Sequence, residues 1–216
     1  MPGLFEKTAI KSMELKNRLV RSATVERMCD DDGLPTRELF GLYERLAKGG
    51  VGLIITGMTY VSTDGRTFPT GGAGIDRDQS VAAWRALTDH VHGLGTGVKI
   101  AMQIAHGGRQ TTRAATGQTP MAPSAVTDGS SFVTPREMTE DEKVYVGALL
   151  DRVYEQFVRA VSESRGMAVE RVRELAEGRL YTGEEAVGNG LVDRIGTYED
   201  ALDMAARMGG IAGEPR

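Results

Sequence analysis

The chain has only one cysteine among its 216 residues, so it can form no disulfide bond within itself and no cysteine-rich metal site. This residue, Cys29, precedes three aspartates whose negative charges disfavour a thiolate, and we expect it to be chemically inert. Histidine is also scarce. The three histidines, His90, His92 and His106, all lie in the first half of the chain.

Long apolar runs are missing as well. No segment has the length of a transmembrane helix, and the N-terminus lacks the apolar stretch of a signal peptide, so we expect a cytoplasmic chain with no membrane contact. The formal net charge of −4 is spread along the sequence, which argues against a nucleic-acid partner. The contents of 40% hydrophobic and 26% charged residues are those of an ordinary globular protein.

The first part of the sequence alternates between short apolar runs and amphipathic segments. The apolar runs predict strands at 18–22, 51–56 and 98–104, and residues with helical spacing predict helices at 35–48 and 79–94. The run at 51–56 is continuous and β-branched, as in a strand buried on both faces of a parallel sheet. This order predicts a βαβαβ unit and an α/β fold.

The pattern changes after a segment at 111–135 that is rich in Thr, Gly, Ser and Pro and is predicted to be a loop. The remainder is predicted to be mainly helical. The predicted elements are a long amphipathic helix at 143–163, a helix at 169–177, a capping box from Thr182 to Glu185, a brief strand at 191–193 and a last helix after Thr197.

Five separated motifs stand out in the first part: LKNRLVRSAT at 15–24, GGVGLIITG at 49–57, TGGAGI at 70–75, QIAHGGR at 103–109 and APS at 122–124. Together and in this order they resemble the old yellow enzyme family of flavin-dependent oxidoreductases. The resemblance runs from about residue 4 to 142. It implies the first three strand–helix units of a (β/α)8 barrel, hence an incomplete barrel, with FMN across the C-terminal ends of the strands.

The resemblance also implies which residues would contact a flavin. Ala23 and Thr24 would end the first strand beside the ring, and Gly57, ending the second, would let the backbone approach it. Gln103, at the end of the third strand, would hydrogen-bond the pyrimidine edge, since an amide both donates and accepts. The alternative is that these residues have no ligand. Ala23, Thr24 and Gly57 would then simply be small residues at strand ends, and Gln103 a half-buried amide. His106 has a structural role under the same resemblance.

The parts of such an enzyme that carry out catalysis have no counterpart in the sequence. Family members hold substrate with paired histidines, or His and Asn, after the fourth strand, and hold the FMN phosphate after strands seven and eight. Neither pattern occurs after residue 142. We therefore predict no catalytic residues, no metal, weak residual FMN binding at most, and no turnover of a small-molecule substrate.

The second part has motifs of its own: REMTEDE at 136–142, YEQF at 154–157, GRLYTG at 178–183 and GLVD at 190–193. From about residue 136 onward they resemble the C-terminal end of a different family, signal peptide peptidase A, whose members are crotonase-like serine proteases with a Ser-Lys dyad. The family's base is a lysine shortly before the first motif, and 131–135 contains none. The predicted peptidase fragment therefore lacks its dyad and acts at most as an assembly module.

The two resemblances meet at 135–142, which suits both families. We predict two parts, 1–135 and 136–216, joined by recombination, deletion or an assembly error between genes. A fusion with a new non-enzymatic role is the remaining alternative. Because a three-stranded sheet leaves two unpaired edges and the tail helices lack the sheet they cover in their family, we also expect marginal stability and self-association.

Overall fold

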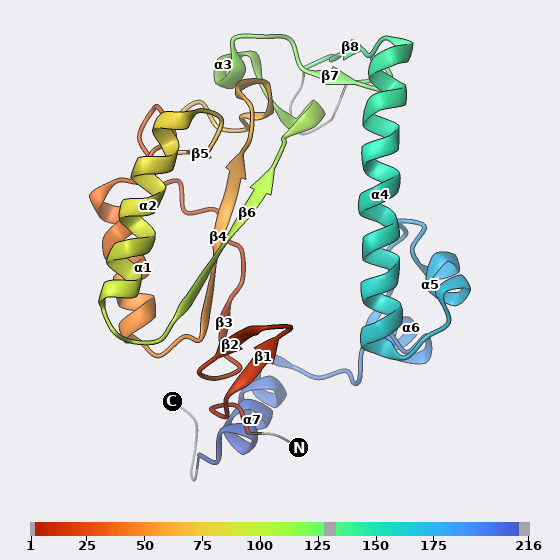
Figure 1. The fold of residues 1–216 in the computed structure, drawn as a ribbon. Coiled ribbons are helices and arrows are strands. Elements are labelled where there is room, and N and C mark those ends of the chain that lie inside the picture. The colour runs from red at the N-terminus through yellow and green to blue at the C-terminus, as the bar shows by residue number, and fades with distance from the viewer. Residues whose placement is uncertain (1–2, 128–132, 212–216) are drawn as a thin grey trace. The chain divides into compact units, whose positions relative to one another are not determined.

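The computed structural model describes residues 3–127 and 133–211 (Figure 1). The chain divides into two compact units, Met1–Glu137 and Met138–Arg216. The first unit combines strands and helices, and the described part of the second consists of helices joined by turns.

A parallel sheet forms the centre of the first unit. Its middle strand β4 (Leu53–Tyr60) pairs in parallel with β3 (Val20–Arg21) on one side and with β6 (Lys99–Ala105) on the other. The short strand β5 (Ala73–Gly74) pairs with the C-terminal end of β4. Because helices separate β3, β4 and β6 in the sequence, the predicted βαβαβ order is confirmed.

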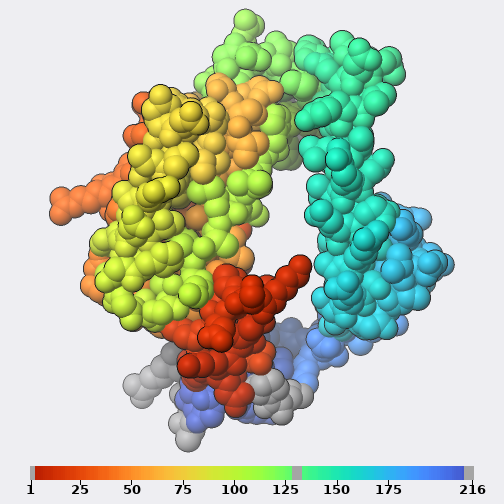
Figure 2. Space-filling model, in the orientation of Figure 1, coloured from red at the N-terminus to blue at the C-terminus, as the bar shows by residue number. Residues whose placement is uncertain are grey.

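Two helices, α1 (Arg37–Lys48) and α2 (Asp78–Gly93), cover one face of this sheet and pack against each other (Figures 1 and 2). Each helix buries side chains spaced three or four residues apart, which lie on one face. The buried apolar core of the first unit consists of Cys29, Leu39, Tyr43, Ala47, Ile54, Trp84, Leu87, Val91 and Val98.

The strand bounds differ from those that the sequence predicts. β4 does not end at Thr56 but continues through Gly57 to Tyr60. The expectation that Gly57 ends the second strand is therefore wrong. The expected strand at 18–22 is reduced to the two residues of β3, because only Val20 and Arg21 have ladder partners on β4.

Other short elements of the first unit were not predicted. An antiparallel hairpin of β1 (Thr8–Ile10) and β2 (Met13–Leu15) precedes the sheet. The predicted loop at 111–135 contains a one-turn helix, α3 (Arg113–Thr116), and β7 (Met121–Ala122), which pairs in parallel with β8 (Arg136–Glu137). The described part of the unit also contains two 3-10 turns, η1 (Thr63–Gly65) and η2 (Gly108–Gln110). Two- or three-residue strands carry too short a pattern to be identified by periodicity.

The second unit contains α4 (Glu140–Arg165), α5 (Val169–Leu175), α6 (Gly183–Gly188) and α7 (Tyr198–Gly209). Complete capping boxes begin α4, α6 and α7, including the predicted one from Thr182 to Glu185. The expected strand at 191–193 is wrong. The N–H of Leu191 instead donates to the carbonyl of Ala186, which ends α6 in a turn.

α4 and α5 pack together through buried Val158, Val172 and Leu175. Both terminal nitrogens of Arg173 reach the two carboxylate oxygens of Glu155, at 2.6 and 2.8 Å, and form an exposed bidentate ion pair between the two helices. None of the described helices combines the length and apolarity needed to cross a membrane.

Candidate functional site

Ala23 and Thr24 lie beyond the C-terminal end of β3, separated from its last residue, Arg21, by Ser22. Ala23 is half-buried and Thr24 is exposed. The Thr24 hydroxyl donates to the Ser22 carbonyl at 3.1 Å and accepts from the Arg21 guanidinium, which also donates to Ser22 at 2.7 Å. The hydroxyl of Thr24 is thus engaged within its own turn.

Gly57 lies against the chain segment that follows β3. A Cβ atom at this position would stand 2.5 Å from the carbonyl oxygen of Thr24, 2.6 Å from the Glu26 carboxylate and 3.1 Å from the Cα of Val25. Such distances leave no room for a side chain. The structure therefore explains the glycine by close packing of β4 against residues 24–26, and it brings Thr24 and Gly57 together.

Gln103 lies in β6, two residues before the strand ends, and its side chain is exposed. Ile100 and Met102 pack toward the helix-covered core, so the alternation of a strand turns Gln103 to the opposite, open face. Within the described parts of the chain its side-chain amide has no hydrogen-bond partner.

Met58 is a residue of this face that the sequence reasoning missed. It is the ladder partner of Gln103 across β4 and β6, and residues paired in this way lie side by side on a sheet face. The sequence feature that could have indicated its place is Gly57, the residue before it. A glycine inside a strand pattern often marks a β-bulge, and a bulge changes the face of the sheet on which the following residues lie. A register shift between Ile55 and Met58 marks such an irregularity here.

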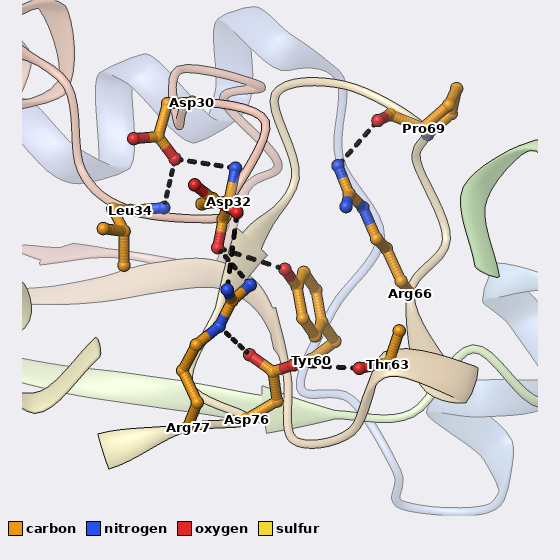
Figure 3. A network of polar contacts seen from close by, with 9 residues as sticks. All are labelled: Asp30, Asp32, Leu34, Tyr60, Thr63, Arg66, Pro69, Asp76 and Arg77. Carbon is orange, nitrogen blue, oxygen red and sulfur yellow. Dashed lines mark hydrogen bonds and ion pairs between the residues drawn. The ribbon is translucent and has the colours of Figure 1, made fainter. Parts of the chain in front are cut away.

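The loops at the C-terminal ends of β3 and β4 are joined by a polar network centred on Arg77 (Figure 3). Its guanidinium donates to the carbonyl of Asp32 at 3.0 Å and pairs with the carboxylates of Asp32 and Asp76, both at 3.4 Å. Asp76 also accepts from the hydroxyl of Thr63 at 3.1 Å, and the Tyr60 hydroxyl donates to the Asp32 carbonyl at 3.5 Å. These contacts hold the loops above the strand ends.

The tight turn after β3 that enters this network depends on Asp30 and Gly33. One Asp30 carboxylate oxygen accepts from the N–H groups of Asp32 and Leu34, at 3.0 and 2.8 Å (Figure 3). Gly33 has φ +79°, and a Cβ there would stand 2.5 Å from the Tyr60 hydroxyl oxygen. Glycine meets both the backbone and the space requirement.

A small cavity of about 10 Å³, enough for about one water molecule, lies on the helix side of Gly57. Glu26, Cys29 and Tyr43 are among its lining residues. Burial raises the pKa of the Cys29 thiol to about 12, in accord with an inert cysteine, and burial also raises the pKa of Glu26 and of Tyr43. The buried Tyr43 hydroxyl has no hydrogen-bond partner among the described residues.

His106 follows β6, and its Nε2 lies 3.5 Å from the carboxylate of Asp64 in η1. Its Nδ1 accepts from the N–H of Gly108 at 3.0 Å. A Cβ on Gly65 would stand 2.6 Å from the imidazole ring. The Nε2 contact therefore links His106 to η1, and the Nδ1 contact is local to the turn that follows β6.

The sequence model of the NADH:flavin oxidoreductase / NADH oxidase family matches residues 3–166. The chain belongs to this family. The NADH oxidase of Thermoanaerobacter brockii is 33% identical over 171 residues, which are 76% of this chain and 24% of that protein. The solved structure of morphinone reductase is 25% identical, with a TM-score of 0.59, and is matched over 97% of this chain and 60% of its own length.

Residues 125–211 match a second sequence model, that of peptidase family S49. A protein of Enterococcus faecium described as a signal peptide peptidase SppA is 46% identical over 65 residues, which are 30% of this chain and 19% of that protein. The chain spans about a quarter of the length of the NADH oxidase and still less of the peptidase. It therefore carries the resemblances of two families in succession.

The two matches overlap at residues 125–166, which include β8 and all of α4. The predicted shared stretch at 135–142 lies within this overlap. Within the overlap, α4 has three acidic residues in its first turn, Glu140, Asp141 and Glu142.

Proposed function

We propose that this chain is a fragment of an FMN-dependent ene-reductase-like oxidoreductase that keeps the part of the site facing the flavin ring. The observation that carries the proposal is Gln103. Its amide lies without a protein partner on the open face of a parallel sheet, near the C-terminal end of its strand and beside Met58. Ligands of such folds bind at this edge of the sheet.

These residues fit the edge of a flavin ring. An amide can accept from one ring atom and donate to the next, and the Thr24 backbone lies against the neighbouring strand at Gly57. Bound FMN would supply hydride transfer, and the chain would supply orientation of the ring through Gln103, Ala23 and the Thr24 backbone. Gly57 contributes by letting residues 24–26 come close to β4.

The charged end of FMN is not accommodated in the same way. In the family a phosphate is held after the seventh and eighth barrel strands, whereas the described residues after Glu137 form α4 to α7 and no strand. A phosphate dianion depends on charge-assisted hydrogen bonds. We therefore propose weak FMN binding and no turnover, with no catalytic residue assigned.

A second proposal concerns the C-terminal part. Its likeness to peptidase family S49 supports a crotonase-like peptidase fragment without its Ser-Lys dyad, joined near residue 135 to the flavin-type part. Such a fragment would serve in assembly and would not cleave peptides. Casein incubated with the purified chain should remain intact, and cleavage that a serine-directed reagent abolishes would contradict this proposal.

The flavin proposal is tested by titration of the purified chain with FMN, followed by flavin absorbance and fluorescence. We expect saturable binding with a dissociation constant of about 100 μM or weaker. Gln103→Leu should weaken it, and Gln110→Leu, which alters an exposed amide just beyond the site, should not. Failure to bind at all would refute the proposal. A yellow preparation that oxidises a nicotinamide would refute the predicted lack of turnover.

A further inference from the structure

β4 and β6 do not pair evenly along their length. Ile55 is the ladder partner of Ala101, and the next pair along the strands is Met58 with Gln103. Two residues of β4 therefore stand opposite one residue of β6, which is the defining feature of a β-bulge. A bulge leaves backbone groups without their usual ladder partners, and buried groups of this kind need a replacement.

The replacement at this bulge is the hydroxyl of Thr56, which is only 2% exposed. The backbone N–H of Gln103 donates to Thr56 Oγ1 at 3.1 Å, and the same hydroxyl donates to the carbonyl of Gly57 at 3.0 Å. An N–H can only donate, so the hydroxyl accepts from Gln103 and keeps its own proton for Gly57.

A second buried hydroxyl stabilises the same bulge without touching Gln103. Thr59, fully buried, donates to the Gly57 carbonyl at 3.1 Å, and its oxygen lies 3.5 Å from that of Thr56. The bulge therefore has two side-chain supports of equal chemistry. Only the one from Thr56 reaches the strand that carries the exposed amide.

We propose that Thr56 is a positioning residue for Gln103, the residue proposed above to bind the edge of the flavin ring, and that it acts through the backbone of Gln103. Its hydroxyl fixes the Gln103 N–H across the bulge, and this fixes the direction in which the Gln103 side chain leaves the sheet. The inference rests on the proposed function for its consequence, since an oriented amide matters only if a ligand uses it. The hydrogen bond itself can be tested without any ligand.

The test compares Thr56→Val, which keeps the side-chain shape and removes the hydroxyl, with Thr56→Ser, which keeps the hydroxyl. Thr59→Val is the matched control, because it removes a hydroxyl from the same bulge without a bond to Gln103. Hydrogen exchange of the Gln103 amide, resolved by NMR, is the direct readout. We expect Thr56→Val to speed this exchange by about tenfold or more, and Thr56→Ser and Thr59→Val to leave it within about threefold.

FMN titration of the same variants gives the functional readout, with circular dichroism as the check that each variant is folded. Thr56→Val should weaken FMN binding by about fivefold or more in the otherwise unaltered chain, and it should have no further effect in the Gln103→Leu background. Thr56→Ser should bind FMN as the unaltered chain does.

The outcomes separate the two proposals. If Thr56→Val and Thr59→Val change the Gln103 exchange and the FMN affinity equally, Thr56 only supports the bulge and the positioning role is refuted. The positioning role is also refuted if Thr56→Val does not fold and the Gln103 amide of Thr56→Ser exchanges as fast as an amide without a hydrogen bond. If Gln103→Leu does not affect FMN binding, the proposed function fails, whatever the exchange experiment shows.

Discussion

The indole Nε1 of Trp84 donates a hydrogen bond of 2.8 Å to the carbonyl oxygen of Gly74. This bond joins the middle of α2 to β5, and Trp84 is 4% exposed within the buried core of the first unit. Gly74 in turn pairs with Tyr60 at the C-terminal end of β4. A single side chain therefore connects the helix layer to the loop that borders the candidate site.

Replacement of Trp84 by phenylalanine removes this bond and part of the core volume. The Gly74 carbonyl loses a buried donor, and the smaller ring leaves a cavity, so we expect the free energy of unfolding to fall by about 2–4 kcal/mol. Urea unfolding followed by far-ultraviolet circular dichroism measures the change, since the only tryptophan is lost. An unaltered unfolding midpoint would show that α2 does not depend on this contact.

Gly57→Ala should lower the free energy of unfolding more than an alanine substitution at a glycine with open surroundings does. The new methyl group would press on the backbone of Thr24 and the carboxylate of Glu26, and overpacking of this kind costs about 1–3 kcal/mol. Gly93→Ala, at the last residue of α2, is the matched control, because no atom lies within 4 Å of its Cβ position. Thermal melts of both variants should differ clearly, and equal melting temperatures would refute the packing explanation for Gly57.

The sequence predicts the helices of the first unit well, because their apolar spacing is itself the cause of their packing. Leu39, Tyr43 and Ala47 recur every four residues, and all three are buried against the sheet. The three main strands were also predicted, from short apolar runs of which only the one at 51–56 is continuous. Family membership follows from the motifs and is confirmed by the match over residues 3–166.

The site was predicted less completely, because its geometry depends on contacts between distant residues. Gly57 was placed at a strand end by the family resemblance. Its actual neighbours are Thr24 and Glu26, more than thirty positions earlier. The register of Met58 with Gln103 depends in turn on the bulge beside Gly57, so neither partner could be assigned from local pattern alone.

The exposed apolar stripe of α4 predicts self-association of the chain. Tyr145, Leu149, Leu150, Val153 and Phe157 are each at least half exposed, and the side chains of α4 can be followed along its length in Figure 2. Leu150→Glu should weaken concentration-dependent association by about tenfold or more. Ala148→Glu, which places the same charge about half a turn away on an exposed residue, should not. Sedimentation velocity at several concentrations decides between them, and a monomer throughout would contradict the prediction.

Glu26 predicts a specific dependence of stability on pH. Burial raises the pKa of its carboxyl above the ordinary value of 4.5, although Arg21, 3.5 Å away, opposes this. The folded chain therefore binds a proton that the unfolded chain has lost, and this contribution to stability disappears as the pH rises from 4.5 through the raised value. Glu26→Gln does not titrate, so its melting temperature relative to the unaltered chain should be higher at about pH 7 than at about pH 4. Thermal melts of both proteins at both pH values measure the difference between their melting temperatures at each pH. If this difference became smaller as the pH rises, the Arg21 ion pair, rather than burial, would have the larger effect on the pKa of Glu26.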